Sequence, residues 1–330
     1  MTPPSIVVVS HFDDGEFAHA GQRVRALERL GCDVTPVDLG KRPGLLGRLT
    51  GADLEKRIAK AAADAEADLV LVLGGYELDE STVVLQRSAT GVPWVNWFPD
   101  GLARVDDIAK VAAGYDRLYA VGSDVKYEIE ARVGKPVEVL PHGADPSVYR
   151  PIKSRDQYRA NVVFAGTATP AREAYLSGLV EFGLALWGPG WRRTSLRDYC
   201  RGEYRSTAEY VKAYGGATVA INLHRDLPLV PVDGRASCNQ RVFELAAMGV
   251  AQVVDERSDL SRWFDVETQV ATFRNQKELK AQVEAVLHNP PGAEAMATAA
   301  RAEVLARHTH IHRMQALLEG IGAEIPTARG

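Results

Sequence analysis

A carboxylate within an otherwise apolar stretch is the feature of the sequence that points most directly to chemistry. Residues 237–249 read Ser-Cys-Asn-Gln-Arg-Val-Phe-Glu-Leu-Ala-Ala-Met-Gly. Ser237 with Gln240 is typical of a capping box, and Gly249 is a typical C-terminal stop, so the pattern predicts a helix. Glu244 falls inside it among apolar neighbours, where a carboxylate costs free energy unless it is paired or binds a ligand.

Two interpretations of Glu244 remain open at this point. The N–H groups at a helix start attract phosphate. A nucleotide could therefore place its phosphates at this helix start and its ribose hydroxyls on Glu244, one turn further in. Alternatively, Glu244 lies at the helix edge and pairs with a nearby arginine.

Two glycine-containing turns add to the nucleotide interpretation. Gly166 and Thr167 stand between a predicted strand and a predicted helix, where backbone N–H groups could hold a diphosphate with Arg172 as the cation. An ordinary turn with a solvated arginine is the alternative. Gly188 and Gly190 would let the backbone approach a ligand closely, or simply form a turn.

Composition limits the classes of protein to consider. The 330 residues suit two domains of ordinary size, and 46% hydrophobic with 25% charged residues is typical of a globular protein. A net charge of −4 gives no general attraction for nucleic acid or an anionic membrane. The apolar run 6–9 is too short for a signal peptide or a membrane span. Three scattered cysteines imply no disulfide framework, which favours a reducing compartment, so we expect a cytoplasmic protein.

Apolar runs alternate with helical patterns along the whole chain. Such alternation predicts strands of a parallel sheet covered on both faces. It occurs twice, before and after a turn-rich link at residues 141–151, and therefore predicts an α/β protein with two Rossmann-like doubly wound sheets facing across a cleft. The expected strands are residues 6–9, 34–37, 69–73, 92–98, 118–121, 137–140, 161–165, 183–187, 217–223 and 251–254.

Five segments, in this order, carry a resemblance to a known family. They are Val163–Thr167 with Arg172 behind it, Leu186–Trp191, Ala220–His224, Arg241–Glu244 with Gly249, and His308–Arg313. Over about residues 140–316 the chain resembles the GT-B glycosyltransferases. Within them it is similar to the bacterial spore-maturation, CgeB-like group of family 1/family 4 type enzymes.

The resemblance implies the organisation of the chain and its ligands. Residues 1–148 would form an N-terminal acceptor domain, 149–305 a donor domain, and 306–330 a helix that crosses back, with a tail. The donor is a nucleoside diphosphate sugar, and the acceptor a glycan or small molecule. In relatives the residue that matches Glu244 meets the ribose, while a glutamate eight positions earlier lies near the donor sugar; that earlier position is Ala236 here. The implied donor-binding residues are Gly166, Thr167, Arg172, Gly188, Gly190, Ser237, Asn239, Arg241 and Glu244.

The N-terminal half supplies candidates for a general base. His11 and Asp13 follow the first predicted strand, and Asp100 follows the fourth, where a doubly wound fold places its site. A base would take the proton of an acceptor hydroxyl if the enzyme inverts. Aspartate is also common in loops for purely structural reasons.

We expect no metal site and no cofactor. His308, His310 and His312 are spaced by two, which sends side chains to different faces of a helix. The chain has no Asp-x-Asp pair either. Helix dipoles and cations would then stabilise the leaving diphosphate in place of a metal.

Four arginines recur at every fourth position, so a helix would align them on one face. That face could bind diphosphate or a polyanionic acceptor, but interspersed acidic residues also suit a salt-bridged surface facing solvent. The residues are Arg193, Arg197, Arg201 and Arg205.

The expected function is transfer of a sugar from a nucleoside diphosphate sugar to an acceptor hydroxyl, without a metal. Two alternatives remain: a nucleotide-sugar epimerase on the same scaffold, and a non-catalytic nucleotide-sugar or glycan-binding protein, which the loss of a glutamate at Ala236 keeps open. No nucleic acid partner is expected. The sugar, the base, the acceptor, the stereochemistry and the oligomeric state are not determined by the sequence.

Overall fold

The computed structural model describes residues 3–12, 19–40, 54–204, 206–225, 227 and 234–322. Asp13 and Arg205 lie outside the described residues. The chain divides into two compact units. Within the described residues, unit 1 contains the chain up to Pro141 and again from His310, and unit 2 contains His142–Thr309.

Unit 1 is built on a six-stranded, entirely parallel sheet in the order β2-β1-β3-β4-β5-β6. Its central strands are continuous apolar runs and are buried, as strands covered on both faces must be. The strands are β1 (Ser5–Ser10), β2 (Asp33–Asp38), β3 (Leu69–Leu73), β4 (Trp94–Phe98), β5 (Arg117–Ala120) and β6 (Glu138–Val139). The helices are α1 (His19–Arg29), α3 (Leu54–Asp64), α4 (Glu80–Thr90), α5 (Val105–Ala112) and α6 (Ser123–Val133).

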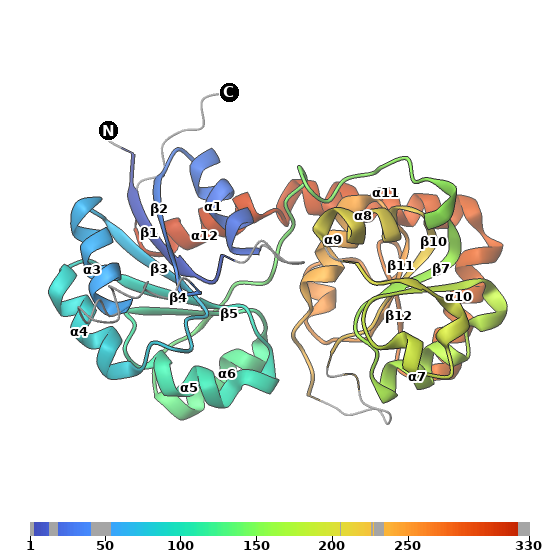
Figure 1. Cartoon of the computed structure of the whole chain (residues 1–330), viewed down its shortest axis with the longest axis horizontal. Helices are drawn as coiled ribbons and strands as arrows, with labels where there is room; N and C mark the ends of the chain where they lie inside the picture. Colours follow the sequence, from blue (N-terminus) through green and yellow to red (C-terminus); the bar gives the residue numbers. More distant parts are fainter. Residues whose placement is uncertain are drawn as a thin grey trace. The chain divides into compact units, whose positions relative to one another are not determined.

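The last helix of the chain, α12 (His310–Gly320), belongs to unit 1. Figure 1 shows it, in red, beside α1, in blue. Met314, Leu317 and Leu318 are fully buried in the cluster that contains strand residues of β1 and β3. Arg313 Nε also donates to the carbonyl oxygen of Pro141 at 2.9 Å. Helix α12 is therefore part of the core of unit 1, which the chain enters a second time.

Unit 2 repeats the architecture with a second six-stranded parallel sheet, in the order β12-β11-β10-β7-β8-β9. The strands are β7 (Ala160–Ala165), β8 (Leu184–Trp187), β9 (Cys200–Gly202), β10 (Ala217–Asn222), β11 (Gln252–Asp255) and β12 (Ala271–Phe273). The helices are α7 (Pro170–Ser177), α8 (Thr207–Gly215), α9 (Gln240–Met248), α10 (Gln276–His288) and α11 (Pro290–Arg307). The two sheets confirm the predicted α/β class with two doubly wound parallel sheets.

The arginine-rich stretch does not form the predicted helix. It contains two short 3-10 turns, Trp191–Arg193 and Arg197–Tyr199, followed directly by β9. Arg201 lies in that strand, and its guanidinium donates to the carbonyl oxygen of Arg159 at 2.7 Å. Pairing with the edge of the sheet therefore overrides the four-residue periodicity.

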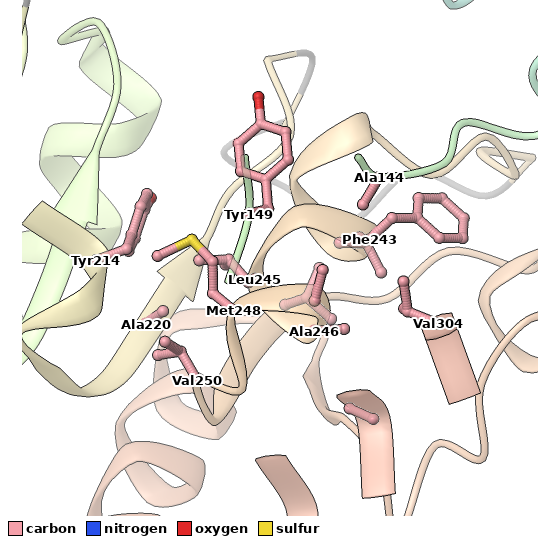
Figure 2. Close-up of a cluster of buried hydrophobic side chains, with 14 of the residues drawn as sticks. Ala144, Tyr149, Tyr214, Ala220, Phe243, Leu245, Ala246, Met248, Val250 and Val304 are labelled. Carbon is pink, nitrogen blue, oxygen red and sulfur yellow. The ribbon is translucent and has the colours of Figure 1, made fainter. Parts of the chain in front are cut away.

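Helix α9 is buried along almost its whole length. Seven of its nine residues, Val242 to Met248, are each at most 2% exposed, as expected of a helix that is apolar on all sides. It ends at Gly249, whose φ of 65° is left-handed, as predicted. Figure 2 shows part of this cluster, with Phe243, Leu245, Ala246 and Met248 of α9 among Tyr149, Tyr214 and Val304.

Candidate functional site

The start of α9 differs from the predicted capping box. Asn239 is the N-cap, and its side-chain oxygen accepts from the Val242 N–H at 3.2 Å. Ser237 lies two residues before the cap and is half-buried. The Gln240 side chain donates to Glu244 at 3.0 Å. The capping-box prediction was wrong because the Ser-x-x-Gln pattern fits the sequence two residues ahead of the helix that forms.

Glu244 is an interior carboxylate held by hydrogen bonds. The residue is 2% exposed. Its carboxylate accepts from Tyr210 Oη at 2.9 Å and from Gln240 Nε2 at 3.0 Å. Burial raises the pKa of Glu244, against hydrogen bonds from Tyr210 and Tyr149 that lower it. Among the described residues no arginine forms a salt bridge with it, so the helix-edge interpretation was wrong.

Tyr210, on α8, joins this carboxylate to a cation. Its hydroxyl donates to Glu244 and accepts from Arg241 Nε at 3.2 Å. That bond uses the side of the Arg241 guanidinium and leaves its two terminal nitrogens without an acceptor among the described residues. Sequence analysis missed Tyr210, although Tyr210 and Tyr214 recur at the four-residue spacing of one helix face.

Arg172 lies in the first turn of α7, directly after the β7–α7 turn. It is 7% exposed, and its terminal nitrogens donate to the carbonyl oxygens of Thr167 (2.9 Å) and Leu223 (3.0 Å). Burial, and then the positive charge of Arg241, lower the pKa of Arg172 to about 10. The side chain is therefore still protonated at neutral pH.

Arg172 and Arg241 come together against one aromatic ring. Their guanidinium carbons lie 5.2 Å and 5.6 Å from the centroid of the Phe164 ring. Within the part of the chain that the structure describes, neither guanidinium forms a salt bridge with a carboxylate. Two neighbouring cations without an anionic partner repel each other, so the arrangement favours binding of an anion with more than one charge.

The predicted glycine turn lies beside these cations. A Cβ on Gly166 would come within 3.0 Å of the Phe164 ring. Gly188 has a φ of +121°, and a Cβ there would lie 2.5 Å from the Gly166 carbonyl oxygen. The group that Gly188 approaches closely is thus the backbone at the end of another strand, β7. Gly190, at φ +90°, similarly faces Ala168. Both glycines pack behind the turn, while Thr167 is exposed at its tip and its N–H donates to no described residue.

Two of the three candidate bases share a pocket in unit 1. The pocket has a volume of about 440 Å³ and lies at the carboxyl ends of β1, β3 and β4, as predicted for a doubly wound sheet. Its lining residues are His11, Tyr76, Glu77, Asp100, Arg104 and Asp107. The third candidate, Asp13, lies outside the described residues.

The lining side chains of this pocket are paired with one another. His11 Nε2 contacts the carboxylate of Glu77. Tyr76 Oη donates to Asp100 at 2.5 Å, and burial together with the Asp100 charge raises the pKa of Tyr76. The Arg104 guanidinium covers the Tyr76 ring, 4.3 Å from its centroid. Asp100 is therefore held in place by a neutral hydroxyl donor.

No group of three or more metal-ligating side chains occurs among the described residues. His308 is 6% exposed and contacts the Glu303 carboxylate, while His310 begins α12 and is 1% exposed. No described helix is long and apolar enough to span a membrane.

Comparison with solved structures gives the fold. A glycosyltransferase from Rickettsia africae is similar with a TM-score of 0.68 and 12% identity, covering 97% of this chain and 98% of that one. Anabaena HepE, solved with UDP and glucose, has a TM-score of 0.69 at 12% identity over 97% and 99%. Sucrose-phosphate synthase from Thermosynechococcus elongatus has a TM-score of 0.67 at 12% identity over 97% and 99%. The chain has the GT-B fold.

The cation pair and the buried carboxylate fall within the part of the chain that a family model matches. A family model described as glycosyl transferase-like matches residues 171–319, less than half of the chain. The segment contains Arg172, Tyr210, Arg241 and Glu244. A search of curated protein sequences returns no match. The predicted glycosyltransferase class agrees with the family model and with the structural neighbours.

Proposed function

We propose that the protein is a glycosyltransferase that moves a sugar from a nucleoside diphosphate sugar to an acceptor hydroxyl. The observation that carries the proposal is the pair of cations, Arg172 and Arg241, without a carboxylate partner among the described residues. A diphosphate supplies two negative charges for such a pair. Support comes from the family model, the fold, and the complexes of HepE with UDP and with UDP-glucose.

The donor would bind along the elements that hold these cations. The diphosphate contacts Arg172, the terminal nitrogens of Arg241, the N–H of Thr167 and the N-terminal end of α9. The ribose hydroxyls reach the carboxylate of Glu244, whose four acceptor positions are not all used by Tyr210, Gln240 and Tyr149. Gly166, Gly188 and Gly190 shape the turn, and Ser237 and Asn239 lie just before α9.

Fixed cations and N–H dipoles aimed at the diphosphate stabilise the charge that develops as it leaves. We therefore infer a metal-independent reaction with no cofactor besides the donor. The acceptor, a glycan or a small molecule, binds in the pocket of unit 1. Asp100 takes the proton of its hydroxyl there, with His11 as the second candidate.

At the level of subgroup, we propose that the protein is similar to the spore-maturation, CgeB-like enzymes and is cytoplasmic, with the resemblance of its sequence motifs as support. One difference bears on catalysis. Where relatives have a glutamate near the donor sugar, this chain has Ala236, which is 4% exposed. Contacts to the sugar must therefore differ from those of the relatives.

The test is thermal unfolding with UDP, GDP, TDP and ADP sugars, followed by incubation of the best donor alone and with a panel of glycans. A ligand at a hundred times its dissociation constant stabilises by about 2.7 kcal/mol. The proposal predicts stabilisation, slow hydrolysis of the donor alone, and faster release of nucleoside diphosphate with one acceptor class. Conversion of the donor alone into an isomeric nucleotide sugar would identify an epimerase. Binding without any turnover would identify a binding protein.

A further inference from the structure

A buried network of hydrogen-bonded polar side chains reaches the start of α9 from the neighbouring strands. His224 lies just after β10, and Asp255 ends β11 beside it. Arg257 follows two residues later. All three residues are 4% exposed, and none of them belongs to the cation pair or to the pocket of unit 1.

The hydrogen bonds of this network converge on the Asp255 carboxylate. Two nitrogens of Arg257 donate to Asp255 Oδ2, at 2.9 Å and 2.7 Å. His224 Nδ1 lies 2.8 Å from Asp255 Oδ1, which also accepts from the His224 backbone N–H at 2.8 Å. At the far end, the backbone N–H of Asn239 donates to His224 Nε2 at 2.8 Å.

These partners fix the tautomer of His224. A backbone N–H can only donate, so Nε2 must accept and carries no proton. The proton of the neutral imidazole is then on Nδ1, where it faces the Asp255 carboxylate. Asp255, in turn, is oriented by the two nitrogens of Arg257.

Asn239 is the residue whose position matters for the donor site. It is the N-cap of α9, and Arg241 is two residues further on. The Asn239 side chain donates to Asn222 Oδ1 at 2.8 Å, so the cap is held by side chains from β10 as well as by His224. The direction of the first N–H groups of α9 and of the Arg241 side chain therefore depends on this cap.

We propose that His224 is a positioning residue for the diphosphate: through its Nε2 it holds the Asn239 N–H, and so fixes the first turn of α9 against the ligand. The inference rests on the proposed function. Asp255 and Arg257 act through His224 by keeping its proton on Nδ1. His224 itself need not contact the donor.

Two substitutions separate the two bonds of the imidazole. Glutamine can place its amide oxygen near the position of Nε2 and so keep the acceptor for Asn239. Asparagine can place its amide nitrogen near the position of Nδ1 and so keep the donor to Asp255. The experiment is calorimetric titration of wild type, His224→Gln and His224→Asn with whichever of UDP, GDP, ADP and TDP binds wild type most tightly.

We expect His224→Gln to bind within about threefold of wild type and His224→Asn to bind about tenfold more weakly, the equivalent of one hydrogen bond. Equal affinity of His224→Asn and wild type, or equal losses in both variants, would overturn the inference. If wild type binds none of the four nucleotides, the proposed function fails and the inference fails with it.

A second measurement does not depend on a variant. Long-range proton–nitrogen NMR of wild type should show His224 protonated on Nδ1 and unprotonated on Nε2, both free and with the nucleotide. A proton on Nε2 would rule out the bond from Asn239, and with it the positioning role.

Discussion

Arg172 and Arg241 belong to different helices, α7 and α9, yet both guanidinium groups lie over the ring of Phe164. Each terminal nitrogen of Arg172 donates to a backbone carbonyl oxygen, whereas the hydrogen bond of Arg241 to Tyr210 uses Nε. The two cations therefore have different roles in the proposed site. Arg172 supplies a fixed charge, and Arg241 presents two free nitrogens to the ligand.

Glu244 should account for recognition of the ribose. We expect Glu244→Gln to lose roughly 1.5–3 kcal/mol of affinity for the nucleoside diphosphate, the cost of losing a charged hydrogen bond. The loss should disappear with the 2′,3′-dideoxy form of the same nucleotide, which lacks the hydroxyls. Titration of both proteins with both nucleotides forms a double-mutant cycle. An equal loss with both nucleotides would remove the ribose from the assignment.

Tyr210→Phe should weaken both binding and stability. The change removes the hydroxyl that links Arg241 to Glu244 and leaves a buried carboxylate with one donor fewer, which costs about 1–3 kcal/mol of unfolding free energy. Affinity for the nucleoside diphosphate should fall as Arg241 loses its anchor. Tyr199→Phe, a half-buried tyrosine of the same unit, is the control and should change neither quantity. Unchanged affinity in Tyr210→Phe would mean that Arg241 needs no support.

Much of the fold could be predicted because buried parallel strands are apolar runs. Residues 6–9 and 69–73 are predicted correctly for that reason. β9 and β12 were missed, since each is a three-residue strand at a sheet edge, without such a run. The four-residue arginine spacing suggested a helix where pairing with β8 formed a strand instead.

The site was only partly predictable because several of its contacts join distant parts of the sequence. Burial of Glu244 follows from its apolar neighbours, and the sequence indicates it. The hydroxyl of Tyr210, 34 residues away, has no local signature. The requirement for glycine at position 188 likewise comes from the Gly166 carbonyl oxygen, which belongs to another strand end. Spacing alone cannot distinguish such a contact from a ligand contact.

Asp255→Asn should change stability in a pH-dependent way. Burial raises the pKa of Asp255, but His224 and Arg257 outweigh it, so the pKa in the folded protein lies below the ordinary value of 3.8. The ionised group thus contributes stability above about pH 4 that is lost as the pH falls through the folded-state pKa. At neutral pH the variant should be less stable by about 3–5 kcal/mol, because Arg257 is left buried without its partner.

Unfolding midpoints between pH 7 and pH 2 check this prediction. The variant should have a lower unfolding midpoint than wild type at pH 7. Its midpoint should also fall less than that of wild type as the pH is lowered. Asp198→Asn, at an exposed position, should follow the wild-type profile. Parallel profiles for wild type and Asp255→Asn would show that Asp255 is not the group that titrates.

Asp100→Asn should lower turnover without affecting the nucleotide. Removing a general base costs roughly 10²–10⁴ in rate, whereas the proposed nucleotide site lies in unit 2. Asp107→Asn is the matched control, because its carboxylate lines the same pocket but pairs with Arg104 at 3.2 Å. Release of nucleoside diphosphate is the measurement. Normal turnover in Asp100→Asn would move the assignment to His11, and loss of nucleotide affinity would show that the variant is not a clean test.

The central claim is that Arg172 and Arg241 hold a diphosphate without a metal. It is tested by titrating wild type and Arg241→Gln with UDP, GDP, ADP and TDP and with their monophosphates, in excess chelator, with the exposed Arg193→Gln as control. At least one diphosphate should bind wild type and Arg193→Gln more tightly than its monophosphate, and Arg241→Gln should lose that preference at a cost of about 1.5–3 kcal/mol. Equal affinities of wild type for monophosphate and diphosphate, or binding that appears only when magnesium or manganese is added, would contradict the account.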